Sequence, residues 1–475
     1  MKGHNASRKA QTATYVITDW ITTSLAFLLF NVVRFFALYR GATDTAALID
    51  YLDDGKILTE QAVIPLVILG FYWLSGYYNR PFGKSRLQEL VTTLLSALLC
   101  TVLIYLALLT NDLIAKRSIN WGLMLVLFSL LFTCVYAGRL IITTNARKQF
   151  RLHNWQVNVL IVGNSPASRS TAANLRASTV RFGYNVLGYV SIPGEENAAD
   201  DISPIPLSDI EEAVRRHSID VIVISPERYD DRIVLDLLYR LFPLNVPIKI
   251  APDTLSLLTS NVHLQDIFGE PFVDLTTPAI SESAKNVKRL MDVVLSSLAM
   301  IVLSPLYAVV AAMVKADSRG PVVYSQERIG YRQCPFRIYK FRTMRTDAEA
   351  SGPMLSSDCD PRVTRVGRVL RKYRLDETLQ FWNVLRGDMS LVGPRPEREY
   401  YIRQIVKEAP YYSMVHQVRP GITGWGMVKY GYASTLAQMV KRTRYDIIYL
   451  SNMSLAVDLK IMIYTVKTIL SGRGK

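Results

Sequence analysis

The chain begins with four long runs of apolar residues. The runs cover residues 15–36, 62–78, 90–110 and 121–142, and polar loops separate them. An α-helix needs about 20 consecutive apolar residues to cross the hydrocarbon core of a bilayer, and each run approaches that length. The pattern therefore predicts a four-span transmembrane domain of α-helices over residues 1–150.

The lysines and arginines around these runs predict their orientation. Basic residues gather before the first run, between the second and third runs, and after the fourth run: Lys2, Arg8, Lys9, Arg80, Lys84, Arg86, Arg147, Lys148 and Arg151. The loops on the opposite side should then carry few basic residues, but the loop between the third and fourth runs contains Lys116 and Arg117. Because cytoplasmic loops retain positive charge, both ends of the four-span domain should lie in the cytosol.

Three ionisable residues, Asp19, Arg34 and Arg139, lie inside the apolar runs. An ionisable residue within a membrane span is a candidate for a functional role. Each of the three is only a few residues from a predicted span end, however. The simpler interpretation, which we favour, is that these side chains extend to the membrane interface.

The pattern changes at Gln156, where short β-rich runs begin to alternate with helical ones. Such alternation predicts a Rossmann-like α/β domain with a parallel sheet over residues 151–280. The first strand ends in Gly163, but the second and third glycines that a dinucleotide fold uses for close approach to a pyrophosphate are missing. We therefore favour a scaffold or dimerisation role, and nucleotide binding is the alternative.

A fifth apolar run covers residues 290–314, and Ser304-Pro305 interrupts its middle. Proline removes a backbone donor and bends or breaks a helix. Both flanks of the run are basic, whereas a true span is positive on one side only. We therefore predict a re-entrant membrane helix over residues 288–315 that breaks at Ser304 and Pro305. The alternative is a kinked transmembrane helix, which would place everything after it outside the cytosol.

Composition narrows the class of protein. Half of the 475 residues are hydrophobic, yet 55 Lys and Arg face 40 Asp and Glu, for a net charge of +15. In a chain with long apolar runs, this charge favours membrane phospholipid and phosphate-bearing substrates as partners and argues against nucleic acid. The four cysteines have no metal-ligand spacing, which indicates packing residues in a reducing compartment: Cys100, Cys134, Cys334 and Cys359.

The last third of the chain is dense in arginine. One stripe recurs every three residues beside an apolar side: Arg362, Arg365, Arg368 and Arg371. We predict a basic amphipathic helix at the membrane surface that contacts phospholipid or phosphate. A solvated charged face is the ordinary alternative.

Directly after this stripe comes an acidic pair, Asp376-Glu377. Apolar residues around it recur at helical spacing, and we expect them to be buried: Leu375, Leu379, Trp382 and Leu385. Acids in a first helical turn usually only complement the helix dipole. Here basic residues precede the pair and the rigid turn Gly393-Pro394-Arg395-Pro396 follows it. A carboxylate among cations can act as a nucleophile toward phosphorus. Because adjacent side chains on a helix point about 100° apart, we predict that one acid attacks and the other positions metal or handles a proton.

Together these motifs resemble the large form of the monotopic polyprenol-phosphate phosphoglycosyl transferases. Five motifs stand in the family order: Lys288-Arg289-Leu290-Met291-Asp292, Ser304-Pro305, Tyr339-Lys340-Phe341-Arg342-Thr343-Met344, Leu375-Asp376-Glu377 and Gly393-Pro394-Arg395-Pro396. The resemblance covers essentially the whole chain. It implies a four-span bundle, a Rossmann-like middle domain, and a mainly α monotopic catalytic domain with a re-entrant helix over residues 281–475.

The resemblance also implies an activity. In this family a hexose 1-phosphate passes from a UDP-sugar to undecaprenyl phosphate, with release of UMP, at the cytosolic face of the bacterial inner membrane. It implies that Asp376 is the nucleophile and a ligand of Mg²⁺, with Glu377 as its catalytic partner. It also implies phosphate binding by Arg371, Arg395, Lys340 and Arg342.

Several points stay open at the level of sequence. Glucose is favoured by its frequency in the family, but the segment from Met427 to Gly431 departs from the usual family sequence and leaves the sugar undetermined. The product would start exopolysaccharide, capsule or O-antigen assembly, and a homodimer is possible. The alternatives are a catalytically decayed membrane scaffold and a transferase that works by direct displacement without a covalent intermediate.

Overall fold

The structure is a computed structural model that describes the chain from the first helix to the last, with gaps. The described residues are 2–39, 45–79, 81–82, 84, 86–109, 117–151, 156–177, 183–192, 204–227, 230–244, 246–251, 272–274, 280–348, 352, 354–355, 360–431 and 433–470. Arg80, Lys116 and Cys359, which entered the sequence analysis, lie outside these ranges.

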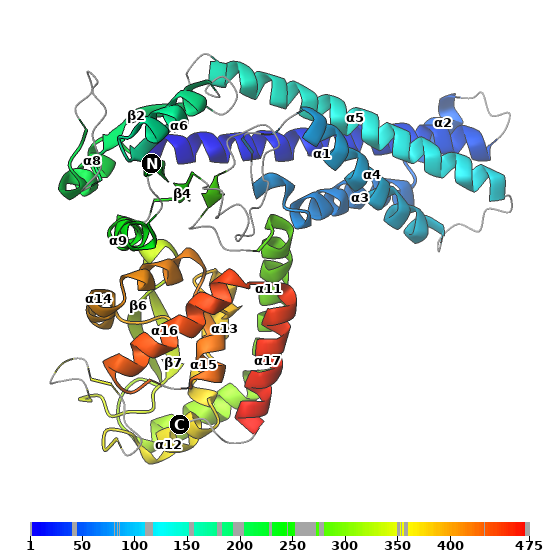
Figure 1. Ribbon diagram of the computed structural model, residues 1–475. Helices are drawn as coiled ribbons and strands as arrows, with labels where there is room; N and C mark the ends of the chain where they lie inside the picture. Colours follow the sequence, from blue (N-terminus) through cyan, green and yellow to red (C-terminus); the bar gives the residue numbers. More distant parts are fainter. Residues whose placement is uncertain are drawn as a thin grey trace. The chain divides into compact units, whose positions relative to one another are not determined.

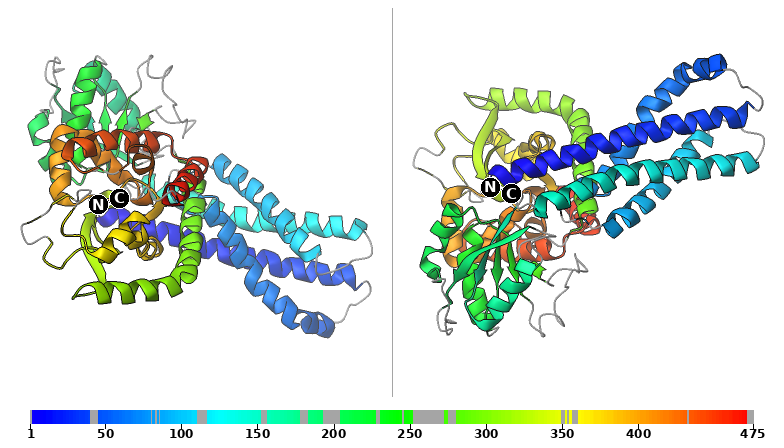
Figure 2. Two further views of the ribbon diagram at one scale, coloured as in Figure 1. Left: turned by 90° about the horizontal axis from the view of Figure 1, so that it is seen from below. Right: turned by 90° about the horizontal axis from the view of Figure 1, so that it is seen from above.

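The N-terminal part consists of α-helices that run side by side (Figures 1 and 2). They are α1 (Lys2–Leu38), α2 (Thr45–Leu52), α3 (Gly55–Leu74), α4 (Arg86–Leu109) and α5 (Arg117–Arg151). Helix α1 packs against α3 and α5, and α4 packs against α5. Four stretches here are long and apolar enough to cross a membrane: Lys9–Leu38, Gly55–Leu74, Glu89–Leu106 and Trp121–Ala146. Each overlaps one of the predicted apolar runs.

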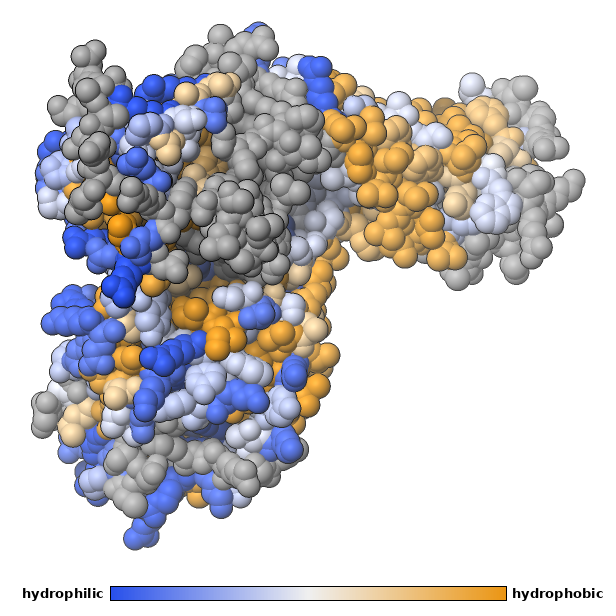
Figure 3. All heavy atoms as spheres, in the orientation of Figure 1, coloured by the Kyte–Doolittle hydropathy of each residue, from blue (hydrophilic) through white to orange (hydrophobic). Residues whose placement is uncertain are grey.

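The outward faces of these helices are hydrophobic (Figure 3). Large apolar side chains at least half exposed include Ile17, Trp20, Ile21, Leu58, Leu66, Leu95, Leu99, Trp121 and Leu125. Soluble proteins rarely leave apolar patches of this extent open to water. The surface therefore indicates association with a membrane.

The three ionisable residues inside the apolar runs are buried and paired. Asp19 and Arg139 have no exposed surface, and their ion pair spans 2.7 Å. Arg34 is only 6% exposed and pairs with Glu60 at 3.1 Å. The prediction that these side chains extend to the membrane interface is therefore wrong. Position along a span does not reveal which face a side chain takes, and here that face is the bundle interior.

A five-stranded sheet follows, in the order β2-β1-β3-β4-β5. Its strands are β1 (Val157–Val162), β2 (Tyr184–Val190), β3 (Val221–Ile224), β4 (Ile248–Ile250) and β5 (Val273–Asp274). The neighbouring helices in sequence are α6 (Pro166–Ala177), α8 (Ile210–Arg216) and α9 (Asp231–Leu241). Strands β3 and β4 are parallel as predicted, whereas β5 is antiparallel to β4 at the edge.

Serine side chains after β1 hydrogen-bond to the backbone of their own segment and to the segment after β3. The Ser168 hydroxyl donates to the Ser225 carbonyl over 2.6 Å, and the Ser165 amide donates to the Ser168 hydroxyl over 3.2 Å. Gly163 has φ of +127°, and a Cβ there would lie 2.3 Å from the Ser225 carbonyl oxygen. This glycine is therefore required for close packing of the loop against the end of β3.

Helix α11 (Glu282–Asp317) opens the C-terminal part. It is the fifth helix that is long and apolar enough to cross a membrane. The helix bends in its middle (Figures 1 and 2), and Pro305 lies inside it. The Ser304 hydroxyl donates to the Ile301 carbonyl over 2.8 Å. That carbonyl is the one that a proline at position 305 leaves without its helical donor, as the sequence predicted.

Short elements follow α11 in the C-terminal part. The strands are β6 (Val323–Ile329), β7 (Pro335–Phe341), β8 (Ser390–Val392) and β9 (Gly421–Thr423). The helices are η4 (Tyr331–Gln333), α12 (Arg365–Lys372), η5 (Leu375–Glu377), α13 (Gln380–Arg386), α14 (Glu399–Glu408), η6 (Pro410–Gln417), α15 (Trp425–Lys429), α16 (Leu436–Ser451) and α17 (Leu455–Leu470). Strands β6 and β7 form an antiparallel hairpin, and β8 and β9 pair in parallel.

Of the apolar residues expected to be buried around the acidic pair, Leu375 and Leu379 pack against a core cluster and Leu385 is partly buried, but Trp382 is not buried. Trp382 is 50% exposed, whereas Gln380 and Asn383 are buried at 2% and 0% exposure. The Asn383 amide donates to the Arg337 carbonyl over 2.7 Å, and its carbonyl accepts from the Tyr339 amide. The polar face of α13 therefore packs against β7. Val384 of the same helix is buried in a core cluster, so Trp382 is the exposed apolar residue of α13, as in a protein that meets a membrane.

Candidate active site

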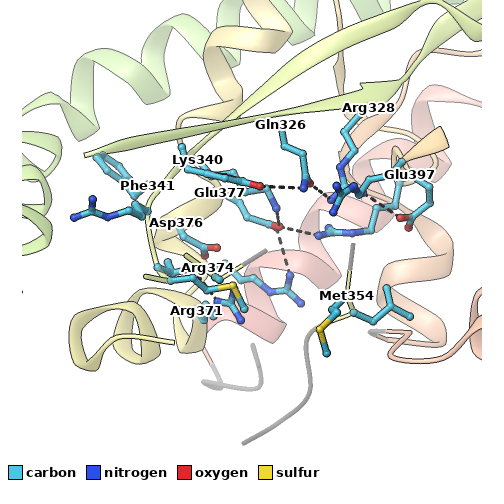
Figure 4. Close-up of a pocket in the computed structure, with 18 of the residues that line it drawn as sticks. Gln326, Arg328, Lys340, Phe341, Met354, Arg371, Arg374, Asp376, Glu377 and Glu397 are labelled. Atoms are coloured by element: carbon cyan, nitrogen blue, oxygen red, sulfur yellow. Dashed lines mark hydrogen bonds and ion pairs between the residues drawn. The ribbon is translucent and has the colours of Figure 1, made fainter. Parts of the chain in front are cut away.

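The acidic pair lies in a short 3₁₀ turn that a left-handed residue introduces. Arg374 has φ of +57°, and η5 follows it directly. Both acids are buried, Asp376 at 8% and Glu377 at 6% exposure. They line a cavity of about 470 Å³, to which β6, β7, α14 and α16 also contribute side chains (Figure 4). The turn thus places two carboxylates at the wall of an open cavity.

Glu377 is held by cations on three sides (Figure 4). Its Oε1 accepts from Lys340 Nζ at 2.7 Å and from Arg395 Nη2 at 2.9 Å, and its Oε2 accepts from Arg374 Nη1 at 3.4 Å. Burial would raise the pKa of this carboxyl, but the charges of Arg395, Lys340 and Arg374 outweigh it. The pKa of Glu377 is therefore held well below its usual range, and Glu377 stays ionised.

Asp376 differs from its neighbour. Its Oδ1 is buried and has no hydrogen-bond partner among the described residues. Burial raises the pKa of Asp376, and the negative charge of Glu377 raises it further, against the opposing effect of Lys340 and Arg371. A buried acceptor without a donor costs free energy, so an unpartnered oxygen in a cavity is typical of a site that awaits a ligand.

The predicted phosphate-binding cations divide into two groups. Lys340, Arg371 and Arg395 line the cavity beside the acids, and Arg371 also donates from Nε to the Thr343 hydroxyl over 3.0 Å. Arg342 lines the cavity too, but its guanidinium donates to the carbonyls of Ser318 and Arg319. Arg342 thereby ties β7 to the end of α11.

The arginine stripe does not act as one surface. Arg362 precedes α12 and pairs with Asp360 at 2.6 Å, whereas Arg371 turns into the cavity. Arg365 and Arg368 lie on the exposed side of α12. The stripe therefore supplies one cation to the site and two to the surface of α12.

Sequence reasoning missed a second buried ionic group in the same cavity. Glu397 is 4% exposed and pairs with Arg328 at 3.1 Å and with Arg442 at 2.5 Å. The three residues come from the segment after the Gly393-to-Pro396 turn, from β6 and from α16. Only the position of Glu397, one residue beyond that turn, could have indicated it from the sequence.

The cavity is strongly cationic. Its basic lining residues are Arg328, Lys340, Arg342, Arg345, Arg371, Arg374, Arg395, Arg398 and Arg442, and its acidic ones are Asp376, Glu377 and Glu397. Such an excess of positive charge suits a ligand with more than one phosphate.

The site fits Mg²⁺ only in the manner of a substrate-bridged ion. The described residues contain no cluster of three or more His, Cys, Asp or Glu that could hold a metal. Mg²⁺ is commonly bound through one or two carboxylates together with substrate phosphates. The unpartnered Oδ1 of Asp376, beside this cationic cavity of about 470 Å³, meets that requirement.

Comparison with known proteins finds related sequences. The sequence model of the family "Bacterial sugar transferase" matches residues 283–472. The chain is 45% identical to UDP-N-acetylgalactosamine-undecaprenyl-phosphate N-acetylgalactosaminephosphotransferase of Aeromonas hydrophila, over 40% of this chain and 44% of the relative. It is 35% identical to UDP-glucose:undecaprenyl-phosphate glucose-1-phosphate transferase of Klebsiella pneumoniae, over 55% of this chain and 56% of the relative.

The match to the first two relatives thus spans only about half of their length, 44% and 56%. A longer match exists to UDP-glucose:undecaprenyl-phosphate glucose-1-phosphate transferase of Escherichia coli, at 30% identity over 66% of this chain and 68% of the relative. The region that the family model matches, residues 283–472, contains the acidic pair, the cations around it and all of α11 except its first residue. The chain therefore belongs to the bacterial sugar transferase family.

Proposed function

We propose that this protein transfers a sugar 1-phosphate from a UDP-sugar to undecaprenyl phosphate and releases UMP. One observation carries the proposal: the unpartnered, buried carboxylate oxygen of Asp376 lies beside a Glu377 that three cations hold in place. The names of the relatives, which act on undecaprenyl phosphate with UDP-sugars, support the same reaction.

The first step is attack by a carboxylate oxygen of Asp376 on the β-phosphorus of the UDP-sugar. An oxygen–phosphorus bond forms, and the bond from the β-phosphorus to the bridging oxygen breaks. The electron pair of that bond leaves with UMP. Lys340, Arg371 and Arg395 offset the charge on the non-bridging oxygens, which is the main way in which proteins accelerate phosphoryl transfer.

The second step regenerates the enzyme. A phosphate oxygen of undecaprenyl phosphate attacks the sugar-bearing phosphorus, and the bond to Asp376 breaks. The products are undecaprenyl diphosphate sugar and the free carboxylate. Glu377 acts by orientation in both steps, because its ion pairs fix Lys340 and Arg395 at the wall of the cavity.

Mg²⁺ would be held by Asp376 and by the phosphates of the donor. When bound, it would supply charge neutralisation at the diphosphate. In this proposal Asp376 is both the nucleophile and a ligand of Mg²⁺. A carboxylate has two oxygens, and Oδ1 has no partner among the described residues.

The proposal includes a location at the inner membrane. The four N-terminal apolar helices span the bilayer, and α11 enters one leaflet and returns at its bend, so that the catalytic part stays in the cytosol with its nucleotide donor. Basic residues on both flanks of the apolar run 290–314 within α11 support this topology, for example Lys285 and Lys315. Phospholipid would cover the exposed apolar face of α11, and a homodimer remains a prediction.

Glucose is the donor that we propose to test first. The relatives include transferases named for UDP-glucose and one named for UDP-N-acetylgalactosamine. An N-acetylated donor is therefore the direct competitor. The product would start the assembly of an exopolysaccharide, a capsule or an O-antigen.

The test uses full-length protein in lipid nanodiscs with undecaprenyl phosphate, Mg²⁺ and a panel of UDP-sugars. We expect release of UMP from at least one donor. Without undecaprenyl phosphate, a donor labelled in the sugar should leave label on the protein. Asp376→Asn should lose both signals, whereas Glu399→Gln, which breaks an exposed ion pair with Arg403, should keep both.

The experiment distinguishes three candidate functions: a transferase with a covalent intermediate, a transferase that works by direct displacement, and a catalytically decayed scaffold. No UMP from any donor would favour a catalytically decayed scaffold. UMP release that requires undecaprenyl phosphate and leaves no label on the protein would favour direct displacement. Labelled wild type and unlabelled Asp376→Asn support the covalent route.

A further inference from the structure

The first turns of α11 contact the backbone of α13 and of β8, which lie next in sequence to the acidic pair and to the turn that carries Arg395. Lys288, Arg289 and Asp292 lie within the first turns of this apolar helix. None of them lines the cavity. Their side chains bind backbone groups about a hundred residues further along the chain, so the reaction mechanism does not account for them.

Arg289 binds the end of α13. Its Nη1 donates to the Val384 carbonyl over 2.7 Å, and its Nη2 donates to the Leu385 carbonyl over 3.0 Å. The last carbonyls of a helix lack intrahelical donors, and a cation there also complements the helix dipole. Arg289 therefore fixes the last turn of the helix that begins three residues after Glu377.

Lys288 and Asp292 bind β8. Lys288 Nζ donates to the Val392 carbonyl over 2.9 Å, and Asp292 Oδ1 accepts from the Leu391 amide over 3.0 Å. Lys288 also pairs with Asp458 of α17 at 2.6 Å, and that carboxylate accepts from the Tyr449 hydroxyl at 2.7 Å. Strand β8 ends one residue before the turn that carries Arg395.

The two segments held in this way are joined at the active site by the pair of Glu377 and Arg395, at 2.9 Å. We infer that Lys288, Arg289 and Asp292 are positioning residues that set the geometry between Asp376 and Arg395. The position of α11 relative to α13 and β8 thereby affects the rate of the reaction. The inference rests on the proposed function, since it concerns the same reaction.

The expected size of the effect follows from geometry. A misplacement of about 1 Å between reacting groups can lower a rate by about 10²-fold. Loss of the fork from Arg289 to two carbonyls would free the end of α13 to move relative to β8. The cavity would keep its cations, so donor binding should change little while the chemical step slows.

The experiment compares two charge-removing variants of full-length protein in nanodiscs. Arg289→Gln removes the fork. Lys285→Gln, four residues earlier on the same helix, removes the same positive charge from the same flank but breaks only a local pair with Glu282 at 2.9 Å. Any effect of flanking charge on membrane topology should be common to both variants, whereas an effect on positioning belongs to Arg289 alone.

We expect Arg289→Gln to lower kcat for UMP release by about tenfold to a hundredfold with KM nearly unchanged, and Lys285→Gln to match wild type. Arg289→Lys, which can reach only one carbonyl, should give an intermediate kcat and keeps the test available if Arg289→Gln does not fold. Wild-type kcat in both Arg289 variants, or an equal loss in Lys285→Gln, overturns the inference. An inactive wild type would instead refute the proposed function.

Discussion

The N-terminal bundle and the cavity each bury a group of ionised side chains, but the two groups are organised differently. In the bundle, all four carboxylate oxygens of Asp19 and Glu89 accept hydrogen bonds, from Arg139, Tyr78, Tyr15, Tyr77 and Thr143. Two acids there face two cations, Arg139 and Lys84. In the cavity, cations are in excess and Asp376 keeps an oxygen without a partner among the described residues.

This difference distinguishes a structural network from a binding site. A buried polar network whose members are all bonded mainly specifies how elements pack. Residues from α1, α4 and α5 meet at Asp19, Thr93 and Arg139, so the network defines the register of these helices. The cavity leaves charge and hydrogen-bonding capacity unused, and a phosphate-bearing ligand can supply both.

The largest effect on stability should come from breaking the bundle network. Arg139→Met leaves Asp19 as an uncompensated charge inside the bundle, at a cost of about 3–5 kcal/mol in the free energy of unfolding. Thermal unfolding of full-length protein in nanodiscs measures this cost. Asp19→Leu combined with Arg139→Met removes both charges and should recover most of the loss. A single variant that unfolds at the wild-type temperature would contradict the contrast drawn between the two regions.

The sequence predicted the parts of this comparison that depend on local pattern. Apolar runs predicted the long helices, and the sequence predicted that Asp376-Glu377 and Arg395 lie close together, as they do in the cavity. The proline at position 305 predicted a carbonyl without its helical donor, and Ser304 binds that carbonyl. Each of these inferences needs only the chemistry of neighbouring residues.

The missed parts depend on contacts between distant residues. Asp19 and Arg139 are 120 positions apart, and Glu397 and Arg442 are 45 apart. Trp382 was expected in a core because apolar spacing marks a buried face in water. Beside a membrane the same spacing can face outward, and a pattern alone does not say which medium covers it.

A smaller effect is expected from removing one charge in the cavity. Glu377→Gln keeps the shape of the side chain but takes the counter-charge from Lys340, Arg374 and Arg395. These cations would then shift, and kcat for UMP release should fall by about 10²-fold, as when an electrostatic contact in a transition state is lost. Thermal unfolding should change less than in Arg139→Met, since no carboxylate is left unpaired by the change. A variant with wild-type kcat would show that the Glu377 ion pairs do not position the cations.

The smallest effect concerns pH and follows from the unequal acids. Asp376 must be ionised to attack phosphorus, and burial together with the charge of Glu377 raises its pKa. The rate should therefore fall, as pH decreases, at a higher pH than an ordinary aspartate would give. Glu377→Gln removes one cause of the raised pKa, so its residual rate should persist to lower pH.

The control for this profile is a second buried acid outside the cavity lining. Burial raises the pKa of Asp446 to about 7, against the charge of Arg442 and a hydrogen bond from the Gly426 amide, and Glu397 adds to the increase. If titration of Asp446 caused the loss of rate, Asp446→Asn would abolish the acid limb and Glu377→Gln would leave it in place. We expect Asp446→Asn to keep the acid limb and Glu377→Gln to move it to lower pH, because Asp376 combines a raised pKa with an oxygen that has no partner among the described residues.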